Sequence, residues 1–178
     1  MKYDSISMLR LAKAFLDIAL WRQTPAHLPA SRFLLALTGC AAALMEVLDV
    51  FLSPGPQDRI MMRVALEVGL PLAFAWVVLT LGRQRARFLQ TATALLGVGV
   101  LAGIVLYPLA ALRSAMGDDR IASIPVGLLL FVGFIWYLLA CAHIWRAALD
   151  SGLIVGGVIS VGYLIVSIAL EQQLLPHT

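Results

Sequence analysis

The sequence predicts an all-α membrane protein with five transmembrane helices in an up-and-down bundle, preceded by an amphipathic helix at the membrane interface. Three observations lead to this fold class. The 178 residues are 61% hydrophobic and only 13% charged, and their mean hydropathy is +0.93. Charged residues make up about a quarter of a soluble domain. Five apolar runs, separated by short polar segments, are each long enough to cross a hydrocarbon core of about 30 Å as a helix.

The apolar runs set the positions of the predicted helices. The connections between them are so short that consecutive helices should be antiparallel neighbours. Helices also satisfy every backbone polar group inside a bilayer. The predicted spans run from Phe33 to Leu52, Ile60 to Leu81, Phe88 to Leu112, Ser123 to Trp145 and Gly152 to Leu170.

Residues 1–32 are predicted to be a cytoplasmic amphipathic helix and a Pro-rich link, and residues 33–178 a single transmembrane domain. Between Ser5 and Trp21, the charged residues Arg10, Lys13 and Asp17 recur at spacings of three and four. Leucine and isoleucine occupy the other faces of the same helix. This pattern is typical of a helix that lies at a membrane surface. The same helix could instead cap the cytoplasmic mouth of the bundle or dock a partner.

The distribution of lysine and arginine predicts the orientation. One side of the predicted spans carries nine basic residues: Lys2, Arg10, Lys13, Arg22, Arg32, Arg83, Arg85, Arg87 and Arg146. The other carries four: Arg59, Arg63, Arg113 and Arg120. Basic residues accumulate on the cytoplasmic side, so we expect a bacterial inner-membrane protein with a cytoplasmic N-terminus and a periplasmic C-terminus. Trp21 and Trp145 fall near the cytoplasmic boundary, where we expect them to be membrane anchors.

Four charged residues within the apolar runs form the main candidate site. Glu46 and Asp49 are three residues apart on one predicted helix, and Arg63 and Glu67 are four apart on the next, so each pair shares a face. Folding the hairpin about Gly55 brings all four together in the outer half of the membrane. Intramembrane charges are costly and usually pair or face a wet cavity.

One arginine among three carboxylates leaves an excess of acid. Arg63 can form a forked ion pair with Asp49 or Glu46, and a remaining carboxylate should keep a proton or hold a cation. The cluster is therefore either a structural clasp between two helices or a proton or cation site with Glu46 as its deepest group. A third possibility is a charged face that meets a partner subunit.

Small and basic residues indicate contacts with membrane components. Gly99 and Gly103 in the third span, and Gly152 and Gly156 in the fifth, have the four-residue spacing that lets helix backbones approach closely. They serve packing within the bundle or contacts with another subunit. Arg83, Arg85 and Arg87 set the topology, or alternatively bind lipid phosphates.

Catalytic and metal-binding patterns are missing from the sequence. There is no His-Glu-x-x-His, no Gly-x-Ser-x-Gly, no phosphate-binding glycine loop, no histidine pair for haem and no Asp-rich magnesium motif. We therefore expect no catalytic residues, no metal and no cofactor. The basic residues lie beside apolar spans, which favours membrane lipid over nucleic acid as their partner.

Two short segments, Trp21-Arg22-Gln23-Thr24-Pro25 and Leu28-Pro29-Ala30-Ser31-Arg32, precede the five closely spaced spans. In this layout the chain resembles the Yip1-type membrane proteins, including uncharacterised bacterial members. The resemblance covers most of the chain and implies a membrane adaptor or organiser. It assigns no functional residue.

Two functions follow from these features. The first is an accessory or scaffold subunit of a larger membrane complex, which packs laterally against other subunits or against itself. Its small size and the lack of an inverted repeat favour this role over that of a large transporter. The alternative is a small proton- or cation-coupled transporter or channel, formed by oligomerisation, that uses the cluster of Glu46, Asp49, Arg63 and Glu67.

Overall fold

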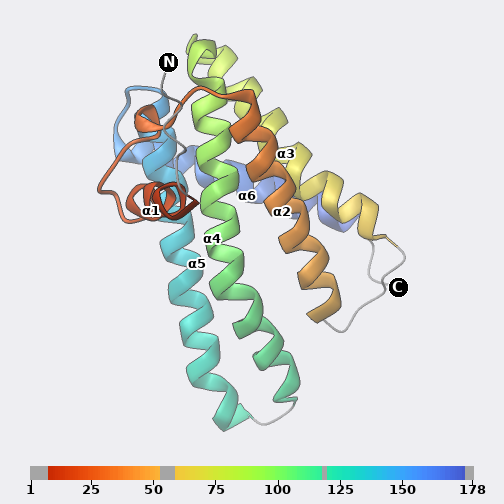
Figure 1. Cartoon of the computed structure of the whole chain (residues 1–178). Helices are drawn as coiled ribbons and strands as arrows, with labels where there is room; N and C mark the ends of the chain where they lie inside the picture. The colour runs from red at the N-terminus through yellow and green to blue at the C-terminus, as the bar shows by residue number, and fades with distance from the viewer. Residues whose placement is uncertain (1–7, 53–58, 118–119, 175–178) are drawn as a thin grey trace.

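The computed structural model describes residues 8–52, 59–117 and 120–174, which are mainly helical (Figure 1). The α-helices are α1 (Met8–Ala19), α2 (Arg32–Leu52), α3 (Ile60–Leu81), α4 (Phe88–Ala115), α5 (Arg120–Ala148) and α6 (Leu153–Leu174). Two 3₁₀ turns, η1 (Pro25–His27) and η2 (Arg85–Arg87), lie in the connections. No β-strand occurs in the described ranges.

Five of these helices, α2 to α6, are long and apolar enough to cross a membrane. The five predicted spans are therefore confirmed as helices of spanning length. The second predicted span has the observed ends, whereas α4, α5 and α6 extend three or four residues further than the apolar runs at their carboxyl ends. Polar residues such as Arg113 and Arg146 continue these helices, because the backbone remains helical after the apolar run has ended.

Helix α4 lies at the centre of the fold. It packs against α2 on one side and α5 on the other, and it also contacts α1 and α3 (Figure 1). Its residues 91–98 are consecutively buried, so every face of the helix is covered along more than two turns. A helix that is apolar all round is suited to such a central position.

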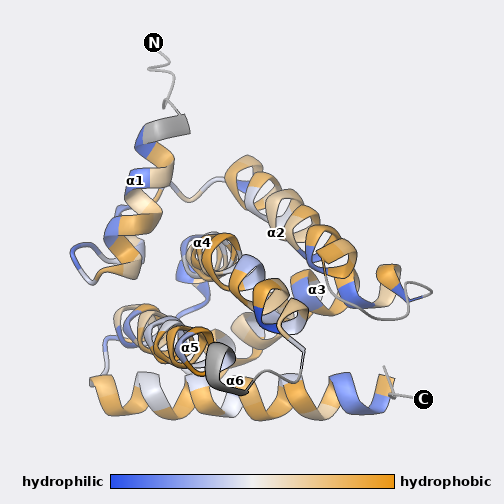
Figure 2. Ribbon diagram, turned by 90° about the horizontal axis from the view of Figure 1, so that it is seen from below, coloured by the Kyte–Doolittle hydropathy of each residue, from blue (hydrophilic) through white to orange (hydrophobic). Residues whose placement is uncertain are grey.

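The helices are not all aligned with one another. Figure 2 looks nearly along α4 and α5, whereas α6 is seen from the side and lies across them. Helices α5 and α6 nevertheless make extensive contact. The crossing has a local cause, because Gly156 lets the α6 backbone lie against the backbone of α5 at Ala142 and Arg146. The aligned up-and-down bundle stays a prediction.

Helix α1 is docked on the other helices rather than separate from them. Ile18 and Ala19 have no exposed surface, and Phe15 joins them in a core with residues of α4 and α5. The Phe15 ring lies directly against Gly97 of α4, where a side chain would overlap it. In the described part of the predicted amphipathic helix, one side is thus occupied by protein.

The segment between α1 and α2 is fastened to the bundle by polar side chains. The amide nitrogen of Gln90 donates to the carbonyl oxygens of Ala26, at 3.1 Å, and Leu28, at 2.7 Å. His143 Nε2 lies 2.9 Å from the carbonyl oxygen of Gln23. Since a carbonyl only accepts, Nε2 carries the hydrogen, and Nδ1 is left to accept from Arg146 at 3.4 Å.

The two tryptophans predicted as anchors have different surroundings. Trp21 is exposed and stacks on His143, with ring centroids 5.5 Å apart. Trp145 is only 2% exposed and packs edge-on against Phe74 at 5.8 Å. The anchor role predicted for Trp145 is therefore wrong, because its ring points into the core between helices.

Several expected features lie outside the described residues. They are the start of the predicted amphipathic segment, the breaker Ser53-Pro54-Gly55-Pro56 with its hairpin glycine, and the last four residues of the chain.

Candidate functional site

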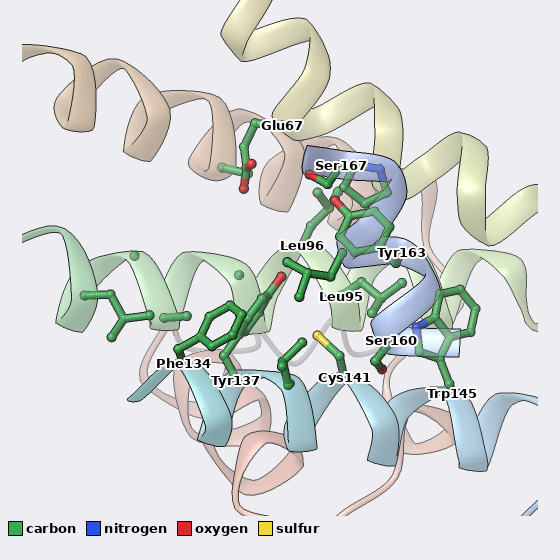
Figure 3. A pocket seen from close by; sticks show the side chains of 18 of the residues that line it. Glu67, Leu95, Leu96, Phe134, Tyr137, Cys141, Trp145, Ser160, Tyr163 and Ser167 are labelled. Atoms are coloured by element: carbon green, nitrogen blue, oxygen red, sulfur yellow. The ribbon is translucent and has the colours of Figure 1, made fainter. Parts of the chain in front are cut away.

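A cavity of about 240 Å³ lies between the spanning helices. Residues of α2, α3, α4, α5 and α6 all line it, so every predicted span contributes to one internal space (Figure 3). Most of the wall is apolar or aromatic. The polar side chains in the wall are few: Glu67, Tyr107, Tyr137, Ser160, Tyr163 and Ser167.

Glu67 supplies a carboxylate to this cavity. It lies on α3, one turn before Pro71, which also lines the wall. In Figure 3 the Glu67 side chain extends toward the space into which Tyr137 rises from α5. Among the described side chains, none forms an ion pair or hydrogen bond with Glu67. An anion in apolar surroundings requires a compensating charge or donor, so Glu67 is suited to hold a cationic group.

The other three members of the predicted charge cluster form a clasp between α2 and α3. Arg63 Nε lies 3.0 Å from Glu46 Oε1, and its NH2 nitrogen lies 3.8 Å from Asp49 Oδ2. Glu46 is 7% exposed, and the side chain of Arg63 retains about a third of its surface. One guanidinium thus binds both carboxylates of α2. Arg63 and Glu67 share a face of α3, but their side chains serve different neighbours.

Arg59, at the start of α3, does not enter this cluster. Its NH1 nitrogen donates to the carbonyl oxygen of Leu174 at 3.0 Å. This hydrogen bond joins the first turn of α3 to the last turn of α6. The start of α3, next to the clasp, is therefore also tied to α6.

The three arginines of the second connection have different environments. Arg83 is exposed and adopts a left-handed backbone, with φ of 56°, directly after α3. The Arg85 side chain donates to the Thr80 hydroxyl at 3.1 Å and lies over the Trp76 ring, 5.7 Å from its centroid. Such contacts hold Arg85 against α3.

Arg87 ties the second connection to the fourth. Its NH2 nitrogen lies 2.6 Å from Asp150 Oδ2, and NH1 donates to the carbonyl oxygens of Ala147 and Ala148 at the end of α5. The hydrogen bond from Arg87 lowers the pKa of the Asp150 carboxyl. Arg87 is thus a structural link between the two connections.

The predicted glycine pairs fill different roles. Gly156 packs against the α5 backbone, and a Cβ atom at Gly103 would lie 3.2 Å from Met45 Cε of α2. Gly99 lines the cavity, where the Tyr137 hydroxyl is 4.0 Å from the position of an added Cβ. Gly152 precedes α6 and has open space around it. Gly103 and Gly156 therefore lie at close contacts within this chain, whereas Gly99 borders the cavity.

Sequence reasoning missed the residues that surround Glu67. The predicted site includes none of the lining residues Tyr107, Tyr137, Tyr163 and Ser167. A usable signal was present, since the last three spans each carry a tyrosine in an otherwise apolar run. A phenol hydroxyl inside a membrane needs a polar partner, which indicates a shared internal space.

In residues 8–52, 59–117 and 120–174, no three His, Cys, Asp or Glu side chains lie close enough together to hold a metal ion. Comparisons with protein-family models, with curated proteins and with solved structures find no match to the chain. The resemblance to Yip1-type proteins stays a prediction.

Proposed function

We propose that the protein binds a small positively charged solute, or a proton, at Glu67 and moves it across the membrane. The observation that carries this proposal is the carboxylate of Glu67 on the wall of a cavity shared by five helices, without an ionic partner among the described side chains. Ionisable groups inside membrane-spanning helices mark ion and substrate pathways in membrane proteins.

Glu67 is a better candidate than Glu46 for this role. Glu46 is engaged with Arg63 at 3.0 Å, and a solute would have to break that ion pair before it could bind. The Glu67 carboxylate requires no such step. The cavity also lies within a single chain, so this proposal needs no oligomer to complete the site.

The proposed setting is a bacterial inner membrane with the N-terminus in the cytoplasm. The excess of lysine and arginine before α2 and in the connections after α3 and α5 supports this orientation. The polar, exposed side of α1, with Arg10 and Lys13, would then face the cytoplasmic interface and its anionic lipids.

Glu67→Gln is expected to abolish proton movement across the membrane, because it removes the anionic group and preserves the side-chain shape. The measurement uses full-length protein in liposomes that contain a pH-sensitive dye, with a membrane potential imposed by a potassium gradient and valinomycin. We expect wild-type liposomes to acidify at least several-fold faster than empty ones, and Glu67→Gln liposomes to match the empty ones.

Asp150→Asn is the matched control for this experiment. It removes an exposed carboxylate from the connection after α5 and leaves the cavity lining unchanged. It should retain the wild-type rate, and size-exclusion chromatography should show both variants folded. Equal rates for wild-type and empty liposomes, both with protons and with sodium or potassium, would contradict transport of inorganic cations and protons.

An accessory role in a larger complex is the second candidate. Gly157 on α6 has no atom within 4 Å of an added Cβ, so another helix could approach α6 closely at this residue. We expect the protein, extracted from its native membrane in mild detergent, to run in native mass spectrometry at a mass above one chain. A monomer under these conditions would contradict the accessory role.

A further inference from the structure

The cavity at Glu67 is surrounded by aromatic rings. Five of its lining side chains are aromatic: Tyr107, Phe134, Tyr137, Trp145 and Tyr163. The face of such a ring carries negative electrostatic potential and attracts cations. In Figure 3 the rings of Tyr137 and Tyr163 rise from α5 and α6 beneath Glu67. The carboxylate and the rings therefore favour the same sign of charge.

These rings are held in place by neighbours outside the cavity. Phe74 of α3 contacts Tyr163 edge-on at 5.3 Å and Trp145 at 5.8 Å. A single ring thus positions two of the lining side chains, which come from α5 and α6. Sites whose side chains are fixed before binding lose less entropy when a ligand enters.

The lining is unsuited to an inorganic divalent cation. Calcium takes six to eight oxygen ligands, and magnesium requires near-octahedral oxygen ligands. The described wall offers one carboxylate and a few hydroxyls among apolar residues. An organic cation matches this lining better, because its charge is spread and its apolar part replaces water along the wall.

The volume limits the size of the ligand. A cavity of about 150 Å³ holds benzene, so the observed 240 Å³ corresponds to roughly ten non-hydrogen atoms by the same ratio. The lining runs along α4 from Leu95 to Tyr107, which is roughly 18 Å at 1.5 Å per residue. A narrow, elongated molecule fits this shape.

We propose that the ligand is a small organic cation, with an ammonium group against Glu67 and an aromatic or alkyl body between the rings of Tyr137 and Tyr163. This inference rests on the proposed function for the location of the site, and it adds the chemical class of the solute. The charge binds the carboxylate, and the body fills the apolar length of the cavity.

Three probes of similar shape and different charge test the ligand class. Benzyltrimethylammonium is the cation, neopentylbenzene replaces its nitrogen by carbon, and phenylmethanesulfonate is the anion. Binding of each is measured by equilibrium dialysis against full-length protein in lipid nanodiscs, with empty nanodiscs as background. We expect saturable binding of the cation, with at least tenfold weaker binding of the other two.

Variants connect this binding to the cavity. Glu67→Gln should weaken binding of the cation at least tenfold, and Tyr163→Leu should weaken it several-fold by removing one ring. Asp150→Asn, outside the cavity, should bind as the wild type does. Equal binding of the cation and neopentylbenzene, unchanged in Glu67→Gln, would overturn the inference and identify the cavity as a slot for apolar chains.

The failures of the two proposals are distinguishable. If Glu67-dependent proton movement is observed and the cation does not bind above background, the ligand class is wrong and transport stands. If the cation binds in a Glu67-dependent way and no liposome assay shows movement of protons or of this cation, transport is wrong and the ligand class stands.

Discussion

Gly156→Ala is expected to destabilise the protein by about 3 kcal/mol, the upper part of the range for overpacked interiors. An added Cβ would overlap the carbonyl oxygen of Ala142 and lie 3.0 Å from the amide nitrogen of Arg146. Both atoms belong to the backbone of α5, so no side-chain rotation can relieve the overlap. Helices α5 and α6 must move apart, and the contacts along their whole crossing weaken.

Gly157→Ala is the control, one residue away on the same helix. No atom lies within 4 Å of an added Cβ at Gly157, and alanine is the better helix former. The free energies of unfolding of both variants are measured by titration with SDS in mixed micelles, with far-ultraviolet circular dichroism. Equal stability of the two variants would contradict the close crossing of α5 and α6 at Gly156.

The spans were predictable and their arrangement was not, for a physical reason. A span is recognised by its own apolar length, which is a local property of the sequence. Its neighbours are chosen by a packed face, and in a membrane protein the lipid-facing side is as apolar as the packed side. Residues 91–98 of α4 are buried, whereas Leu128 and Val158 of neighbouring helices are exposed, although all belong to similar apolar runs.

The candidate site was predictable in composition and only partly in geometry. Helical spacing placed Glu46 with Asp49 and Arg63 with Glu67, and the ion pairs of Arg63 agree with the expected meeting of α2 and α3. The direction taken by Glu67 depends on the space left between five helices. That space is a property of the assembled fold, which no spacing within one helix can show.

The glycine pairs illustrate the same limit. Gly152 and Gly156 have the spacing typical of close helix contacts, but only Gly156 lies inside α6 and against another backbone. Gly152 lies in the connection before the helix begins. A spacing rule assumes that both residues belong to one helix, and a boundary that differs by one residue changes the outcome.

Arg63→Met is expected to destabilise the protein by about 3 kcal/mol, because it leaves Glu46 and Asp49 without their guanidinium. Methionine keeps much of the apolar length of the arginine side chain, so the main loss is electrostatic. Glu46 is nearly buried, and a carboxylate left there without a partner is costly. The estimate is at the lower end for buried pairs because Arg63 retains a third of its exposed surface.

A triple variant separates the ion pairs from the packing of Arg63. If the loss comes from the two carboxylates that lose the guanidinium, adding Glu46→Gln and Asp49→Asn to Arg63→Met should recover most of the stability, since neutral amides need no counter-charge. Arg113→Met, at an exposed position near the end of α4, is the control and should stay near the wild-type value. The SDS titration used for Gly156 measures all variants.

If the triple variant is as unstable as Arg63→Met alone, the clasp acts through the packing of the arginine side chain, and the carboxylates of α2 do not require the guanidinium. Recovery would instead show that α2 and α3 stay in contact without the charges of Glu46, Asp49 and Arg63. Glu67→Gln could then be examined in a background where Glu67 is the one ionisable residue left of the four cluster members.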